Sequence, residues 1–169
     1  AGRYNQVWHS DVSFDPSPPS VSILQALTVP PYGGDTLFAS SYAAYETLCE
    51  PLRSAIDGLK ALHDGLPNFT PYLLDPGTPN GTQRLASMRR ESLTAVHPVV
   101  CRHPVTGRKT LCTGRHAYRI PGMEDTEAQA FLDDLIESAC QPPRLYLHRW
   151  TPGDLVIWDN RCVLHRARP

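Results

Sequence analysis

A histidine and an aspartate lie two residues apart near the start of the sequence, in the stretch YNQVWHSDVSF (residues 4–14). Polar and apolar residues alternate there, which predicts a β-strand over residues 6–14. Residues i and i+2 of a strand project to the same face, so His9 and Asp11 are expected to point together. An imidazole beside a carboxylate on a rigid element is a candidate pair of metal ligands.

A third possible ligand, His165, lies at the other end of the chain in RCVLHRA (161–167), which reads as a strand. A β-sandwich can place its first and late strands side by side and so bring His165 to His9 and Asp11. Two imidazoles and one carboxylate on one face of an ion leave open positions, the arrangement typical of non-haem Fe(II) oxygenases. By spacing alone this prediction is weak, because a lone His-x-Asp is common.

The other histidines have no ligand-like spacing and are interpreted as structural or surface residues: His63, His97, His103, His116 and His148. A serine hydrolase is disfavoured, because no G-x-S-x-G turn is present and Ser10 is expected to face away from its neighbours His9 and Asp11. A non-enzymatic, cupin-like metal-binding module stays open as an alternative.

Length and composition fit one globular domain over residues 1–169, with 41% hydrophobic residues and a net charge of −1. This balance favours neither nucleic acid nor a membrane surface as a partner. No apolar run is long enough for a membrane span, and the N-terminal residues lack the apolar region of a signal peptide. The five cysteines are odd in number and widely spaced, which predicts reduced thiols in a cytoplasmic protein.

The elements that must position the ligands are mostly short strands. We expect strands over 6–14, 20–29, 60–64, 144–150, 154–160 and 161–167, and a hairpin over 95–114 that turns at PVTGRK. We expect helices over 40–48, 51–59 and 125–140, the last with a Thr cap and one apolar face made of Ala128, Phe131, Leu132, Leu135 and Ile136. Residues 64–94 carry much Pro, Gly, Asn and Thr, and are predicted to form a long loop or lid. Many strands with helices in blocks indicate a β-sandwich or jelly roll with flanking helices.

Several motifs together resemble one enzyme family. They are WHSDVSF (8–14), PPYGGDTLFAS (30–40), AAYETL (43–48), HPVVCRHPVTGRKTL (97–111), GDLVIWDN (153–160) and RCVLHRA (161–167). The sequence is similar there to the taurine dioxygenase and 2,4-dichlorophenoxyacetate dioxygenase family of Fe(II)/2-oxoglutarate-dependent oxygenases. The resemblance implies a double-stranded β-helix, or jelly roll. It also implies Fe(II), 2-oxoglutarate and dioxygen, and hydroxylation of a small organic anion, either a sulfonate such as taurine or a phenoxyalkanoate, with release of succinate and CO2.

The resemblance also implies roles for individual residues. His9, Asp11 and His165 match the iron ligands, and Thr36 matches a threonine that contacts a 2-oxoglutarate carboxylate. The residues implied near the substrate are Asn5, Val12, Phe69 and His116. No catalytic residue beyond the metal ligands is implied, and a homo-oligomer is possible.

The chain departs from the family pattern in one important respect. Family members carry further N-terminal sequence, and an arginine for 2-oxoglutarate on a strand beyond the distal histidine. With His165 facing inward, strand alternation points Arg166 and Arg168 outward, so neither is expected to replace that arginine. We therefore expect the chain to lack the N-terminal part and the last core strand of the jelly roll.

Overall fold

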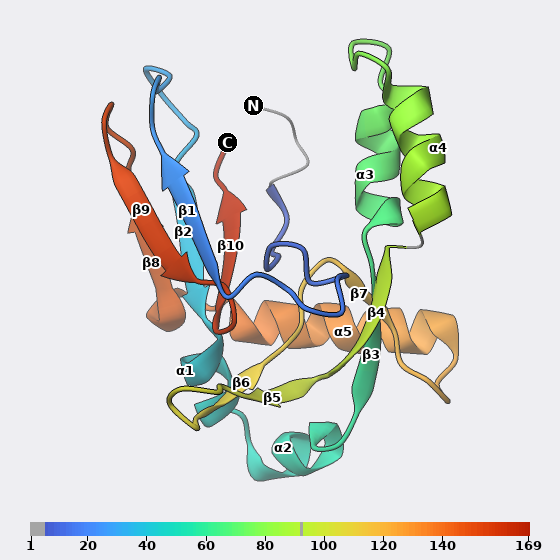
Figure 1. Ribbon diagram of the computed structural model, residues 1–169. Helices are drawn as coiled ribbons and strands as arrows, with labels where there is room; N and C mark the ends of the chain where they lie inside the picture. The colour runs from blue at the N-terminus through green and yellow to red at the C-terminus, as the bar shows by residue number, and fades with distance from the viewer. Residues whose placement is uncertain (1–5, 92) are drawn as a thin grey trace.

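The computed structural model of the chain describes residues 6–91 and 93–169 (Figure 1). Short strands predominate, with helices around them. The strands are β1 (Val21–Gln25), β2 (Thr36–Ser40), β3 (Lys60–Asp64), β4 (Thr94–Pro98), β5 (Val100–Arg102), β6 (Lys109–Leu111), β7 (Ala117–Arg119), β8 (Leu145–His148), β9 (Leu155–Asp159) and β10 (Val163–Ala167). The α-helices are α1 (Ser41–Glu46), α2 (Glu50–Ile56), α3 (Leu66–Leu73), α4 (Gly81–Glu91) and α5 (Asp125–Ala139).

Two antiparallel sheets on one side of the molecule carry the candidate site (Figure 1). One has the strand order β10-β2-β8, and the other pairs β1 with β9. In these ladders His165 lies opposite Phe38, and Ser22 lies opposite Trp158. The mainly β architecture with flanking helices, a jelly roll, confirms the fold class predicted from the sequence.

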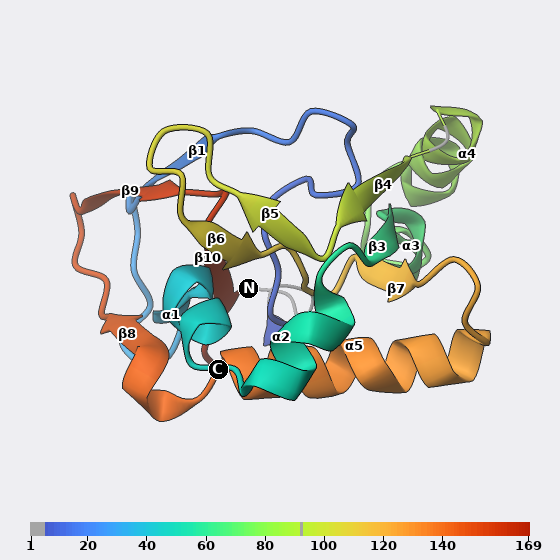
Figure 2. The same ribbon diagram turned by 90° about the horizontal axis from the view of Figure 1, so that it is seen from below.

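The other half of the molecule holds the sheet β4-β3-β7 and the hairpin β5-β6, the latter turning at PVTGRK as predicted. Helix α5 runs along one side of the molecule (Figure 2). Its residues Leu132 and Leu135 are buried in one hydrophobic cluster with Ile56 of α2 and Leu164 of β10. The predicted apolar face of α5 is therefore what joins it to the strands. The cap differs from the prediction, since Glu124 accepts the first main-chain N–H groups of the helix.

Residues 6–14 are not the strand that alternation predicted. Their ladder pairing is limited to one bridge between His9 and His165, and a turn follows over residues 11–14, with Val12 at a φ of 53°. The cause is a competing partner. The Asn160 side chain accepts from the Asp11 N–H at 2.8 Å and donates to the Asp11 carbonyl at 2.9 Å, so these groups are not available to a neighbouring strand.

Residues 64–94 contain the helices α3 and α4, which stand together away from the sheets (Figure 1), and not a structureless loop. Leu73 and Leu85 are buried, although Pro67 and Pro71 in α3 and Gly81 at the start of α4 obscured the helical pattern in the sequence. Pro71 lies inside α3, and the Thr70 hydroxyl donates to the Leu66 carbonyl beside it. The lid role of this segment stays a prediction.

No helix in the described part of the chain is long and apolar enough to cross a membrane.

Candidate metal centre

Three side chains converge at the junction of β10 with the turn after His9. Oδ1 of Asp11 lies 3.7 Å from Nε2 of His9 and 3.5 Å from Nε2 of His165. All three candidate ligand atoms lie within 4.8 Å of one another. The main chains of His9 and His165 exchange hydrogen bonds of 3.1 and 2.9 Å, which fixes the two imidazoles side by side. One ion can therefore contact all three side chains.

The His9 imidazole presents a neutral nitrogen atom to this centre. Nδ1 of His9 lies 2.8 Å from the Val7 carbonyl, which can only accept, so Nδ1 carries the proton and Nε2 offers its lone pair. Burial and the neighbouring His165 lower the pKa of His9. Nδ1 of His165 is buried and has no hydrogen-bond partner among residues 6–91 and 93–169. The tautomer and the lowered pKa of His9 suit a metal ligand that binds as a neutral imidazole through Nε2.

Asp11 supplies the negative charge. Burial acts to raise the pKa of this carboxyl, but the neighbouring His165 and the hydrogen bond from Ser22 outweigh it and lower the pKa to about 2. The group is thus ionised at neutral pH, which a carboxylate ligand requires. Two imidazoles and one carboxylate fit a borderline divalent ion such as Fe(II), so the residues present fit the metal that the sequence predicted.

A cavity of about 650 Å³ opens in front of the three ligands. Thr36 and Val12, both predicted from the sequence, line it, together with Trp150 and Trp158. The indole N–H of Trp150 donates to the Thr36 hydroxyl oxygen at 3.0 Å. Since that oxygen already accepts, the Thr36 proton is free to be donated to an anion in the cavity. Sequence reasoning did not identify Trp150.

The other predicted substrate residues lie elsewhere. Asn5 falls outside the described residues. Phe69, on α3, contacts Phe14 with ring centroids 5.8 Å apart. His116 is buried behind the centre, with its ring 6.1 Å from that of His9. Neither Phe69 nor His116 lines the cavity in the structure as described.

His116 belongs to a buried hydrogen-bonded chain. The Ser13 hydroxyl lies 3.1 Å from Nδ1 of His116 and 3.1 Å from Nδ1 of His63. Burial lowers the pKa of His63 to about 3 and that of His116 to about 4, and the charges of neighbouring histidines act in the same direction. His116 also bonds to the main chain of Ser10, between the two ligands. These hydrogen bonds therefore support the stretch of main chain that carries His9 and Asp11. Nothing in the spacing of the residues in the sequence indicated them.

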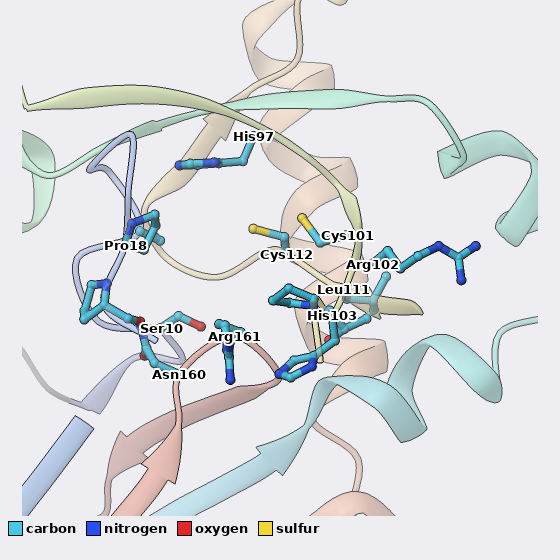
Figure 3. A pocket seen from close by; sticks show the side chains of 14 residues that line it. Ser10, Pro18, His97, Cys101, Arg102, His103, Leu111, Cys112, Asn160 and Arg161 are labelled. Atoms are coloured by element: carbon cyan, nitrogen blue, oxygen red, sulfur yellow. The ribbon is translucent and has the colours of Figure 1, made fainter. Parts of the chain in front are cut away.

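A second cluster of possible ligands is already saturated by protein groups. His103, Asp159 and Cys162 lie close enough to share an ion, beside a cavity of about 240 Å³ whose lining includes His103 (Figure 3). Nδ1 of His103 accepts two main-chain N–H groups, so its Nε2 must donate to Asp159, at 2.9 Å. The Arg161 guanidinium holds both oxygens of the same carboxylate. This cluster therefore has neither a free imidazole lone pair nor a free carboxylate.

The fold and the first centre together have the arrangement expected of a mononuclear 2-His-1-carboxylate site. Comparison with known proteins specifies its family: residues 1–169 match the Taurine catabolism dioxygenase TauD, TfdA family, and the chain belongs to it. The chain is 41% identical to (S)-phenoxypropionate/alpha-ketoglutarate-dioxygenase of Sphingobium herbicidovorans over 98% of its own length and 57% of that protein.

Solved structures agree with this placement. AAD-2 in complex with Mn(II) and N-oxalylglycine matches with a TM-score of 0.85 and 36% identity, over 98% of this chain and 63% of that one. A taurine dioxygenase from Burkholderia xenovorans matches with a TM-score of 0.77 and 34% identity, over 100% of this chain and 52% of that one. The chain thus spans about half to two thirds of the length of these relatives.

Proposed function

We propose that the protein is an Fe(II)/2-oxoglutarate-dependent dioxygenase that hydroxylates a C–H bond of a small organic anion, releasing succinate and CO2. The observation that carries the proposal is the convergence of His9, Asp11 and His165 at one end of an open cavity. A ferrous ion held there supplies, with 2-oxoglutarate and dioxygen, the oxidising power for hydroxylation.

The residues of the chain contribute binding, orientation and exclusion of water. His9, Asp11 and His165 would hold the metal, beside the cavity that the co-substrate would enter. The Thr36 hydroxyl, oriented by Trp150, donates to a carboxylate of the co-substrate. Trp158 packs 4.9 Å from the His165 ring, centroid to centroid, and forms an apolar wall beside the ligands that limits access of water.

A cation for the distal carboxylate of 2-oxoglutarate is absent from the described lining of the cavity, which contains neither Lys nor Arg. Arg166 instead lies over the Trp8 ring, with 4.8 Å from its guanidinium carbon to the ring centroid. This agrees with the outward orientation expected for Arg166. Binding of 2-oxoglutarate by this chain alone is therefore the step that the experiment must test.

For the substrate we propose a phenoxyalkanoate or a sulfonate, because relatives of similar identity are named for (S)-phenoxypropionate and for taurine. The apolar side chains of Val12, Ile23 and Leu24 in the cavity lining suit a ring or a short alkyl chain. Asn5, Phe69 and His116 stay predictions as substrate residues. The proposed location is the cytoplasm, which suits the five free cysteines, and a homo-oligomer stays a prediction.

The test is an anaerobic titration with Fe(II) and then with 2-oxoglutarate, following the visible charge-transfer band of an iron-chelated keto acid, with His165→Ala as the control. A band in the parent that is lost in the control supports the proposal, and succinate release over a panel of phenoxyalkanoates and sulfonates then identifies the substrate. Iron binding without a band would favour a metal-binding module without oxygenase activity. Failure to bind iron would refute the metal centre itself.

A further inference from the structure

Asp11 presents its two carboxylate oxygens to different partners. Oδ1 faces both histidines, at 3.7 Å from Nε2 of His9 and 3.5 Å from Nε2 of His165. Oδ2 accepts a hydrogen bond of 2.5 Å from the hydroxyl of Ser22. One carboxylate oxygen therefore points to the position proposed for the metal, and the other is held by a hydrogen bond within the protein.

The main chain of Asp11 is fixed independently of its side chain. Asn160 accepts from the Asp11 N–H, donates to the Asp11 carbonyl, and also donates to the Pro19 carbonyl at 3.0 Å. The main-chain N–H of Asn160 donates in turn to the Ser20 carbonyl at 3.0 Å. With the main chain held in this way, the main freedom left to the Asp11 carboxylate is rotation of the side chain, and Ser22 restricts it.

We propose that Ser22 is a positioning residue that keeps Asp11 a one-oxygen ligand. A carboxylate whose second oxygen is free can turn and bind a divalent ion through both oxygens. A second oxygen on the ion would occupy one of the open positions that a chelating keto acid and dioxygen need. Ser22, held on β1 by its pairing with β9, thus preserves the vacancy for the co-substrate. The inference rests on the proposed function and adds a residue to it.

This role predicts that the substitution Ser22→Ala changes the affinity for the metal and the affinity for 2-oxoglutarate in different ways. In Ser22→Ala, Mn(II) is expected to bind at least as tightly as in the parent, because the released oxygen becomes an extra ligand. Affinity for 2-oxoglutarate in the presence of the metal is expected to fall about tenfold, because the second carboxylate oxygen would compete for a position that the keto acid needs. A merely structural role for Ser22 would weaken both affinities together.

The experiment measures Mn(II) binding and then anaerobic 2-oxoglutarate binding by calorimetry in the parent protein and its variants. Ser22→Thr and Ser22→Val form a pair of equal shape that differs only in the hydroxyl, so Thr is expected to retain 2-oxoglutarate affinity and Val to lose it. Ser10→Ala is the matched control, because that hydroxyl donates to the Val163 carbonyl and not to Asp11. Its two affinities are expected to keep the parent's ratio.

Two results would overturn the role of Ser22. One is a parallel loss of Mn(II) and 2-oxoglutarate affinity in Ser22→Ala, and the other is equal 2-oxoglutarate affinity in the Thr and Val variants. Failure of the proposed function looks different, because the parent protein itself would then bind no 2-oxoglutarate.

Discussion

Acidification is expected to loosen the metal-binding turn through the buried pair His63 and His116. Burial lowers the pKa of His63 to about 3 and that of His116 to about 4, from 6.5. Both rings are therefore neutral in the folded protein at pH 5, whereas both are protonated when the chain unfolds. The unfolded state binds more protons in this range, so stability falls as the pH drops below 6.5.

The size of the effect depends mainly on the unfolded pKa, because both folded values lie well below pH 5. At pH 5 each histidine takes up a proton when the chain unfolds, because pH 5 lies 1.5 pH units below the ordinary histidine pKa of 6.5. This proton uptake lowers the free energy of unfolding by about 2 kcal/mol per histidine. The pair is thus expected to lower the free energy of unfolding by about 4 kcal/mol between pH 7.5 and pH 5. The lowered pKa of His9 adds in the same direction. Asp11, with a pKa lowered to about 2, loses its contribution only at lower pH.

The assay is urea unfolding of the metal-free protein, with a chelator present, at pH 7.5 and pH 5. His63→Gln removes one titrating group, so its loss of stability over this range is expected to be smaller than that of the parent by about 2 kcal/mol. Ile56→Val is the control, because it removes a buried methyl group and lowers stability by about 1 kcal/mol at both pH values. An unchanged pH dependence in His63→Gln would refute the assignment of this histidine as a buried neutral group.

Three further changes test the site and its support. Asp11→Ala is expected to abolish hydroxylation, and product formation by this variant would exclude Asp11 as a ligand. Trp150→Phe removes the N–H that orients Thr36. It is expected to weaken 2-oxoglutarate binding severalfold, a loss of about 1 kcal/mol, while metal affinity measured by titration stays unchanged. Leu132→Ala opens a cavity beneath the fully buried face of α5 and is expected to lower the free energy of unfolding by about 2–5 kcal/mol in a denaturant titration.

Local periodicity predicted the elements that pack by a single regular face. Helix α5 was predictable because its buried residues Ala128, Leu132 and Leu135 recur at helical spacing. The β5-β6 hairpin was predictable from its Gly-containing turn. Helices α3 and α4 were not predictable, because Pro71 and the two prolines and one glycine between the helices are typical of loops. Only the packing that buries Leu73 and Leu85 compensates for them.

The three candidate ligands lie together as predicted, but partly for another reason than the one that predicted it, and their role as ligands stays a prediction. Strand alternation placed His9 and Asp11 on one face, whereas the structure brings them together by a bridge to His165 followed by a turn. Local sequence could not reveal this turn, because its cause is Asn160, 149 residues away from Asp11. The family motifs pointed to the three candidate ligands, and the contacts that hold their main chain were visible only in the structure.

The same long-range contacts hold the turn that begins at Asp11. The positive φ of Val12 turns the main chain away from the strand direction directly after this candidate ligand. A non-glycine residue holds this conformation only where its surroundings enforce it. Asn160 on one side of the turn and the Ser13–His116 contact on the other supply that enforcement, so the shape of the metal centre depends on residues that contact no metal.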